Sequence, residues 1–231
     1  MTALKEAFDR RGPWITRFWL DGEALGGKEY DPSADARFDL FTSVAGPLSG
    51  KRLLELGPLE GGMTLRLAQE GASVVAVEGR ESNYERCLFI KETFALDSVE
   101  FILGDVRALD AGSLGRFDAV FNVGVLYHLD EPWNLLAALR DLSSHMFVWT
   151  HCASEKKARH TVDVMGKQLK GMWYKERHTK DRLSGLQKRS FWPSRNALDE
   201  MLVLTGWTDV RWLQYVPDSH PGPSGCLWAS A

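Results

Sequence analysis

Apolar residues along this 231-residue chain fall into two kinds of stretch. Short continuous apolar runs are bounded by glycine, proline or charged residues, which is typical of strands buried on both faces of a sheet. The stretches between them carry apolar residues three and four positions apart, which indicates amphipathic helices. Because the two kinds alternate, the pattern predicts an α/β fold, a parallel sheet with helices on both faces.

The expected elements follow from this alternation. Strands are expected at residues 53–56, 73–78, 99–104, 117–124, 145–152, 208–215 and 225–230. Helices are expected at residues 1–11, 34–44, 61–71, 82–96, 131–142 and 196–204. Residues 22–32 contain three glycines and are expected to form a loop.

The stretch from Leu53 to Ala68 predicts a strand, a glycine turn and a helix. Gly57 and Gly61 allow the backbone of such a turn to approach a ligand closely, and the helix N-terminus presents N–H groups to it. A tight turn without a ligand is the alternative for this stretch taken alone.

Polar residues at the ends of later strands favour a ligand. Glu78 ends the second strand, twenty-one residues after Gly57, where a carboxylate can accept hydrogen bonds from a ribose diol. Asp105 follows the third strand, and Asn122 lies near the end of the fourth. Open α/β sheets bind their ligands at these strand ends, so the order of residues predicts a nucleoside site.

This order resembles the class I S-adenosylmethionine (SAM) dependent methyltransferases. Their glycine motif reads acid-x-Gly-x-Gly-x-Gly; Glu55, Gly57 and Gly61 match it, and Leu59 replaces the middle glycine. The resemblance implies SAM as cofactor and a Rossmann-like fold with a seven-stranded, mostly parallel sheet and an antiparallel edge strand. The residues expected to bind the cofactor are Arg37, Glu55, Gly57, Pro58, Gly61, Glu78, Gly79, Arg80, Asp105, Val106, Asn122 and Val123.

A closer likeness is to the tRNA wobble-uridine carboxymethyltransferases. It is carried by residues 124–128 (Gly-Val-Leu-Tyr-His), with Pro132 following, and by residues 191–194 (Phe-Trp-Pro-Ser). The likeness covers roughly residues 30–215. The chain length predicts one methyltransferase domain over residues 1–231. The resemblance to methyltransferases implies that residues 1–46 form a helical cover over the cofactor. Because the long N-terminal extension and basic C-terminus of those enzymes are not matched, ordinary SAM and a small-molecule acceptor are expected, with tRNA less favoured.

Methyl transfer from a sulfonium depends on positioning and on the exclusion of water, because the cofactor is already activated. A general base is needed only if the acceptor still holds its proton. His128, Tyr127 and His151 are the candidate catalytic residues, since all three are expected at the carboxyl ends of strands. Packing roles are the alternative for both histidines.

Residues 155–192 interrupt the alternation and are expected to cover the substrate. Between residues 155 and 190 there are eleven Lys or Arg against four Asp or Glu, although the whole chain has a net charge of −3. Such a segment can hold an anionic small molecule or RNA, and an amphipathic helix with a solvated basic face is the alternative. The residues expected to contact the substrate are Tyr30, Tyr127, Trp173, Tyr174 and Trp192.

Composition restricts the other functions. The three cysteines are far apart, so neither a metal site nor a disulfide set is expected. No apolar stretch approaches the ~20 residues of a membrane helix, and a cytoplasmic location is expected.

The expected function is methyl transfer from SAM to an O or N nucleophile of a small molecule. The alternatives are a tRNA- or RNA-modifying (carboxy)methyltransferase and an NAD-binding oxidoreductase, which would need glycine at position 59.

Overall fold

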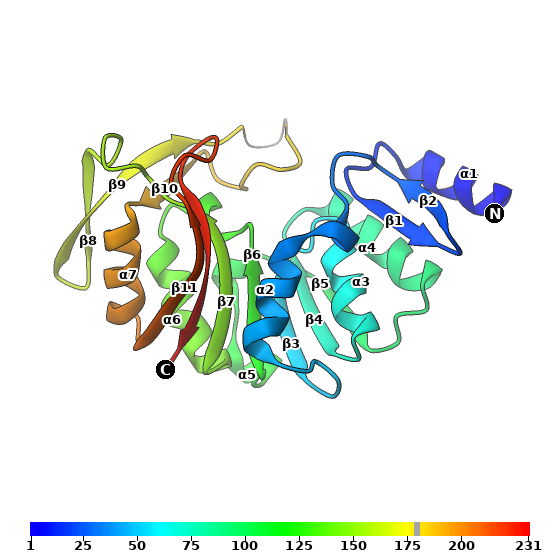
Figure 1. Ribbon diagram of the computed structural model, residues 1–231, viewed down its shortest axis with the longest axis horizontal. Coiled ribbons are helices and arrows are strands. Elements are labelled where there is room, and N and C mark those ends of the chain that lie inside the picture. The colour runs from blue at the N-terminus through cyan, green and yellow to red at the C-terminus, as the bar shows by residue number, and fades with distance from the viewer. Residues whose placement is uncertain (178–180) are drawn as a thin grey trace. The chain divides into compact units, whose positions relative to one another are not determined.

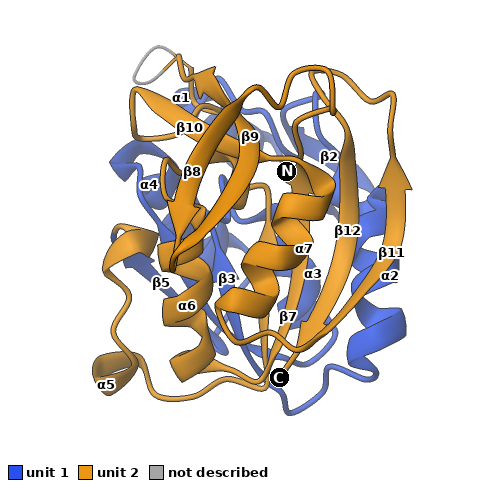
Figure 2. Ribbon diagram, turned by 90° about the vertical axis from the view of Figure 1, so that its left-hand side faces the viewer, with its two compact units in different colours: residues 1–104 blue, residues 105–231 orange. Residues whose placement is uncertain are grey.

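The computed structural model describes residues 1–177 and 181–231, which divide into two units. Unit 1 is residues 1–104 and unit 2 is residues 105–231 (Figure 2). Residues 178–180, which belong to the predicted substrate-covering segment, lie outside the described residues.

Unit 1 contains three parallel strands in the order β3-β4-β5 (Figure 1). They are β3 (Arg52–Leu56), β4 (Ser73–Glu78) and β5 (Val99–Leu103). The crossover helices are α3 (Gly62–Gln69) and α4 (Glu81–Thr93). Side chains of β4 from Val74 to Glu78 are all buried, as the continuous apolar run predicts for a central parallel strand.

The N-terminal part of unit 1 differs from the helical cover that the sequence predicts. It contains α1 (Thr2–Arg11), β1 (Arg17–Leu20), β2 (Glu23–Gly26), the 3₁₀ turn η1 (Pro32–Ala34) and α2 (Ala36–Ala45). The strands β1 and β2 pair antiparallel across Asp21 and Gly22, which have φ of 50° and 81°. Two positive φ angles define the two-residue turn that matches the twist of a hairpin. The expected loop at residues 22–32 is therefore partly wrong.

A buried carboxylate fastens this N-terminal part to the glycine turn. Glu60 is fully buried, and its Oε2 accepts hydrogen bonds from the N–H groups of Ile15 at 2.9 Å and Thr16 at 2.7 Å. Its Oε1 lies 3.7 Å from Nε of Arg86 on α4. One side chain thus joins β1, the glycine turn and α4 within unit 1.

Unit 2 contains four strands in the order β11-β12-β7-β6. The strands β6 (Ala119–Val123) and β7 (His145–His151) are parallel, whereas β12 (Ser224–Ser230) and β11 (Asp209–Val216) are antiparallel. The helices are α5 (Ala111–Leu114), α6 (Pro132–Leu142) and α7 (Arg195–Leu204), with 3₁₀ turns η2 (Val106–Ala108) and η3 (Leu126–His128). The seven strands confirm the predicted mostly parallel sheet with an antiparallel edge.

The basic segment of unit 2 is a small antiparallel sheet, so the alternative of an amphipathic helix is wrong. Its strands are β8 (His160–Val164), β9 (Lys167–Lys175) and β10 (Arg189–Pro193), in the order β10-β9-β8. Met165 and Gly166 join β8 to β9, and Oδ1 of Asp163 accepts a hydrogen bond from the N–H of Gly166 at 3.0 Å. Period-two burial explains the strand: Leu169 and Gly171 are buried, whereas Lys170 is exposed.

The described helices include none that is both long and apolar enough to span a bilayer.

The role of Glu60 can be tested by replacing it with glutamine. Glu60→Gln keeps the shape of the side chain but removes the charge facing Arg86 and one strong acceptor. We expect a loss of about 1–3 kcal/mol in the free energy of unfolding, measured by urea denaturation. Glu70→Gln, an exposed position just after α3, is the matched control and should change little. Equal stability of the two variants would contradict the anchoring role.

Candidate active site

The glycine turn of unit 1 keeps the open shape of the methyltransferase motif despite the missing middle glycine. Gly57 has φ of 64°, and Leu59 adopts the left-handed conformation with φ of 59°. For a residue with a side chain this conformation costs roughly 1–2 kcal/mol. The N–H of Leu59 donates to Oε2 of Glu78 at 3.1 Å, which holds the turn in place. Leu59 thus adopts a conformation that glycine normally takes, and the hydrogen bond to Glu78 helps to hold it there.

Glu55 is a buried carboxyl group at the end of β3. The hydroxyl of Thr64 donates to its Oε2 at 2.5 Å, and it has no cationic partner among the described residues. Burial raises the pKa of Glu55 to about 8, and the charge of Glu78 adds to the shift. A buried acid without a cation fits a ligand that carries an ammonium group, as the amino-acid part of SAM does.

The other predicted cofactor residues of unit 1 surround this turn. Glu78 ends β4 and also accepts the N–H of Arg80 at 2.8 Å. Burial raises the pKa of Glu78 although these backbone hydrogen bonds oppose the shift. Pro58 is buried, Gly79 is half-buried next to Glu78, and Gly61 precedes the first residue of α3.

Arg37 and Tyr30 meet at a third residue, Asp35. Oδ1 of Asp35 accepts from Nε of Arg37 at 2.9 Å, and Oδ2 accepts from the Tyr30 hydroxyl at 2.9 Å. Burial raises the pKa of Tyr30, and the neighbouring Asp35 adds to the shift. Arg37, predicted to bind the cofactor, and Tyr30, predicted to contact the substrate, are thus held together by Asp35. Asp35 was not singled out from the sequence.

Four predicted cofactor residues belong to unit 2. Asp105 precedes η2 and holds Nε of Arg107 at 3.0 Å, and these hydrogen bonds lower the pKa of Asp105. Val106 begins η2 and Val123 ends β6; both are half-buried. Asn122 is fully buried on β6, and neither atom of its amide has a hydrogen-bond partner among the described residues. An unsatisfied buried amide is costly, so this side chain suits contact with a polar ligand.

Unit 2 also contains a pocket of about 200 Å³. Its walls come from η3, β7, β9, β10 and two loops. The lining residues are Tyr127, His128, His151, Tyr174, Glu176, Arg177, Asp181, Leu183, Ser184, Trp192 and Pro221. All three predicted catalytic residues therefore lie on one pocket, together with Tyr174 and Trp192 from the predicted substrate set.

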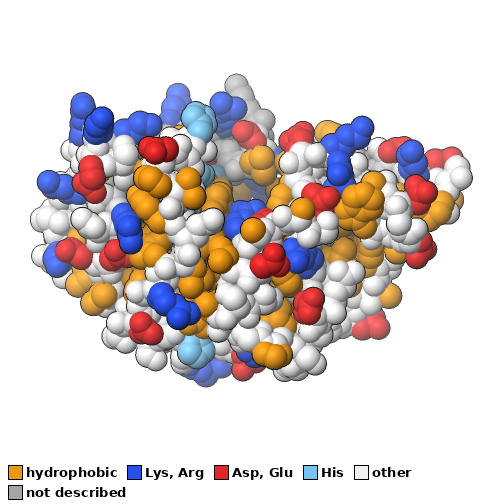
Figure 3. All heavy atoms as spheres, viewed as in Figure 1, with side chains coloured by type: hydrophobic (Ala, Val, Ile, Leu, Met, Phe, Trp, Pro, Cys, Tyr) orange, Lys and Arg blue, Asp and Glu red, His pale blue; other side chains and the backbone are white. Residues whose placement is uncertain are grey.

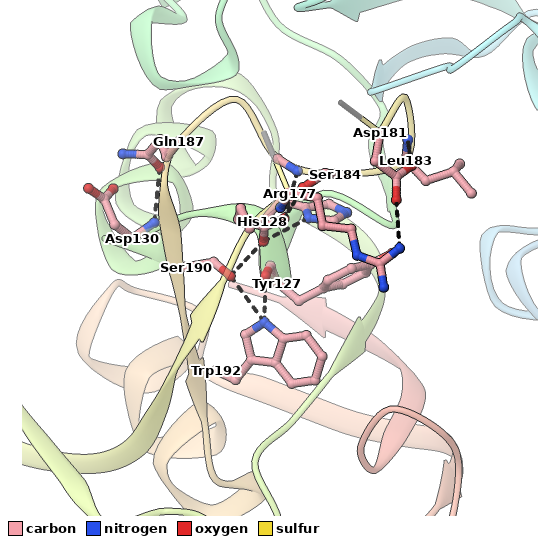
Figure 4. A network of polar contacts seen from close by, with 12 residues as sticks. Tyr127, His128, Asp130, Arg177, Asp181, Leu183, Ser184, Gln187, Ser190 and Trp192 are labelled. Carbon is pink, nitrogen blue, oxygen red and sulfur yellow. Dashed lines mark hydrogen bonds and ion pairs between the residues drawn. The ribbon is translucent and has the colours of Figure 1, made fainter. Parts of the chain in front are cut away.

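His128 and Glu176 form a hydrogen-bonded pair at the wall of this pocket. Nδ1 of His128 lies 3.1 Å from Oε1 of Glu176, and Figure 4 shows His128 within the surrounding polar network. A carboxylate can only accept, so Nδ1 carries a proton, and in the neutral ring Nε2 has the lone pair. Nε2 has no hydrogen-bond partner among the described residues. The pair therefore supplies an oriented proton acceptor.

Glu176 is almost completely satisfied by the groups around it. Besides His128, its carboxylate accepts from the hydroxyls of Ser190 at 2.7 Å and Ser184 at 2.6 Å, and from the N–H of Gly185 at 2.8 Å. Burial alone would raise the pKa of Glu176, but the hydrogen bonds from His128 and the two serines outweigh it and lower the pKa to about 2. Glu176 is therefore a carboxylate at neutral pH.

His151 is held from two sides. Its Nδ1 lies 3.0 Å from the carbonyl oxygen of Gly222, and its ring stacks on Trp192 at 5.1 Å between centroids with 8° between planes. Tyr174 stacks on Trp192 at 4.5 Å. Burial lowers the pKa of His151 although hydrogen bonds to the backbone of Gly222 and Pro223 oppose the shift. The ring is thus a fixed, neutral imidazole at neutral pH.

Other predicted residues lie elsewhere. Trp173 packs against Phe191 at 5.2 Å and under the guanidinium of Arg189 at 4.0 Å, and it does not line the pocket. The exposed basic residues of the segment also lie outside the lining, apart from Arg177; Figure 3 shows Lys and Arg side chains gathered over β8 and β9. Those exposed residues are Lys156, Lys157, Arg159, Lys167, Lys170, Lys175, Lys188 and Arg189.

Sequence reasoning missed Glu176, which had no signal beyond being one of few acids in a basic segment. It also missed Ser184 and Ser190. Across the described parts of the chain, no three His, Cys, Asp or Glu side chains come together as metal ligands.

Comparison with known proteins identifies the class. The methyltransferase-domain family matches residues 54–144. The crystal structure of the N-terminal domain of EvdMO1 with SAH bound superposes with a TM-score of 0.85 at 30% identity, covering 100% of this chain and 96% of that one. The chain belongs to the class I SAM-dependent methyltransferases, and SAM is its cofactor. The oxidoreductase alternative is set aside.

Within that class the chain is similar to several kinds of enzyme. A tRNA U34 carboxymethyltransferase of Alcanivorax borkumensis is 30% identical over 166 residues, which are 71% of this chain and 47% of that protein. The O-antigen chain terminator bifunctional methyltransferase/kinase WbdD of Escherichia coli is 30% identical over 135 residues, which are 52% of this chain and 19% of that protein. The chain thus spans between a fifth and a half of these curated relatives.

The raised pKa of Glu55 predicts how stability changes with pH. A folded pKa of about 8, against an ordinary 4.5, means that the folded protein binds this proton more tightly than the unfolded chain. Protonated Glu55 therefore favours the folded state at low pH, and this contribution is lost as the pH rises from 4.5 through 8. We expect Glu55→Gln to remove a slope of up to about 1.4 kcal/mol per pH unit in that window.

The measurement is urea unfolding of cofactor-free protein at pH 5, 6.5 and 8. The difference between wild type and Glu55→Gln isolates this one carboxyl from the other titrating groups. A difference that stays constant with pH would show that Glu55 titrates normally.

Proposed function

We propose that the protein transfers the methyl group of SAM to a hydroxyl group of an uncharged small molecule, with His128 as the general base. The observation that carries this proposal is the hydrogen bond between His128 and the buried carboxylate of Glu176 at the wall of the pocket. Methyl transfer to a carboxylate or a free amine needs no such base, whereas an alcohol keeps its proton at neutral pH.

His128 and Glu176 can together accept the proton that the acceptor hydroxyl loses. When bound, SAM supplies an activated methyl group on a sulfonium. Nε2 of His128 takes the proton of the acceptor hydroxyl as the oxygen is methylated, and the ring becomes an imidazolium. Glu176 holds the tautomer that makes Nε2 the acceptor and stabilises the positive charge that forms. Glu176 is thus a positioning residue.

The charges around the pocket favour an uncharged acceptor. Glu176 is ionised, His151 is neutral, and Arg177 lies 3.7 Å from Asp181, which balances its charge. Among the described lining residues the net charge is therefore negative, which disfavours an anionic acceptor, and no other basic side chain of the described part of the segment lines the pocket. A structure of the EvdMO1 N-terminal domain was determined in the presence of SAH and D-fucose, a neutral molecule with several hydroxyls, which supports the same choice.

The cofactor residues are proposed from the resemblance together with the local geometry of unit 1. Glu55 would receive the ammonium group, and Glu78, at the end of β4, would receive the ribose hydroxyls. The open path at Gly57 and Leu59 leaves backbone room for the ligand. In unit 2, Asp105 and the unsatisfied Asn122 remain proposed cofactor contacts.

RNA is a second candidate acceptor, because of the exposed lysines and arginines over β8 and β9 and the similarity to tRNA U34 carboxymethyltransferases. Part of this charge is already balanced, since Lys167 lies 3.2 Å from Glu200. We rank RNA below a small molecule, because the basic side chains and the pocket residues are largely different sets.

The general base can be tested with His128→Gln. We expect kcat to fall by roughly 10²–10⁴ while the Kd for SAM, measured by calorimetry, stays within about twofold. The fall of activity at acidic pH that comes from protonation of the base should also disappear. His145→Gln is the matched control, because His145 lies outside the pocket and is exposed on β7. Wild-type activity and an unchanged pH profile in His128→Gln would refute the proposed base.

RNA binding can be tested with total tRNA at two salt concentrations. We expect weak binding, with no further loss when Lys170 and Lys175 are replaced by alanine. Tight binding that falls steeply with salt, and falls again in the double variant, would establish RNA as the acceptor in place of a small molecule.

A further inference from the structure

We infer that the acceptor is a polyol that binds through two neighbouring hydroxyls, one facing His128 and the other donating a hydrogen bond to Nε2 of His151. This inference rests on the proposed function and deepens it, because it names the class of acceptor. It makes His151 a specificity-determining residue rather than a second base.

The orientation of His151 leaves one nitrogen for the ligand. The carbonyl of Gly222 can only accept, so Nδ1 of His151, 3.0 Å away, carries the proton. Nε2 then has a lone pair, and no described residue donates to it. The stack on Trp192, with 8° between planes, fixes the direction in which this lone pair points.

His128 presents a second nitrogen of the same kind to the same pocket. Both histidines lie against one ring: the centroid of Tyr127 is 4.2 Å from that of His128 and 4.9 Å from that of His151. The distance between the two imidazoles cannot exceed the sum of these two separations. Both rings line the one pocket, so a single small molecule with two hydroxyls can present one to each imidazole.

Two fixed acceptors select a ligand with two donors. A neutral imidazole nitrogen without a donor partner loses a hydrogen bond that water would otherwise supply, so a mono-alcohol leaves one acceptor unsatisfied. Carboxylates and phosphates offer only acceptors at neutral pH and are disfavoured. A diol satisfies both nitrogens, and carbohydrates supply such pairs of hydroxyls.

The test compares acceptors that differ by one hydroxyl. Cyclohexanol, cis-1,2-cyclohexanediol, trans-1,2-cyclohexanediol and D-fucose are incubated with enzyme and SAM, and kcat/KM is measured for each. The wild-type enzyme should prefer one diol over cyclohexanol. In His151→Phe, which keeps a ring against Trp192 but lacks the nitrogen, this preference should shrink by roughly 3- to 10-fold, the value of one hydrogen bond.

The control is His145→Phe. His145 also stacks on a tryptophan, Trp228 at 5.4 Å, but lies outside the pocket, so the diol preference should be retained. If His151→Phe fails to fold or to bind SAM, His151→Gln takes its place, with the same expected loss of preference at a smaller size.

The outcomes separate the two proposals. A diol preference that survives in His151→Phe, or a wild-type enzyme that methylates cyclohexanol as well as either diol, overturns the inference and leaves the general base standing. A diol preference that depends on His151 in an enzyme whose His128→Gln variant is fully active supports the polyol acceptor and overturns the proposed base. Failure of the wild-type enzyme to methylate any of the four probes overturns the polyol acceptor.

Discussion

The pocket of unit 2 depends on one buried charge, the carboxylate of Glu176. Taking an ion out of water costs several kcal/mol, and only a nearly complete set of hydrogen bonds offsets that cost. The donors are four residues, His128, Ser184, Gly185 and Ser190. These donors must therefore all be in position when the pocket is formed. The hydrogen bond that His128 donates to Glu176 also fixes the orientation of the His128 ring.

Much of the fold was predictable because its signals are local. Continuous apolar runs gave the parallel strands to within a residue or two, as with Ser73–Glu78, since such a run can only be buried between two layers of helices. The hairpin β1-β2 was not predicted, although Asp21-Gly22 is a favoured two-residue turn and could have signalled it. The hairpin β8-β9 was harder, because its many lysines and arginines concealed the alternation of buried and exposed positions.

The candidate site divides in the same way. Glu55, Gly57 and Glu78 follow each other along strand ends of one unit, so their order in the sequence reports their closeness in space. Glu176 lies 48 residues from His128, and no motif joins them. The pairing of Glu176 with His128 becomes visible only in the folded structure, where the end of β9 brings Glu176 to the pocket. The conformation of Leu59 was likewise beyond the sequence, because glycine is the residue that a left-handed position normally requires.

The charge of the basic segment and the charge of the pocket are different properties, and strand geometry separates them. Side chains of a strand point alternately to opposite faces, so Tyr174 and Glu176 can face the pocket while Lys175 between them is exposed. Summing charge along the segment, as sequence analysis does, mixes the two faces and suggests an anion. The described lining residues alone give an ionised Glu176, an Arg177 whose charge is balanced by Asp181, and two imidazoles that can each accept a hydrogen bond when neutral. That wall offers hydrogen-bond acceptors to a ligand, and the acceptor proposed above is chosen to match them.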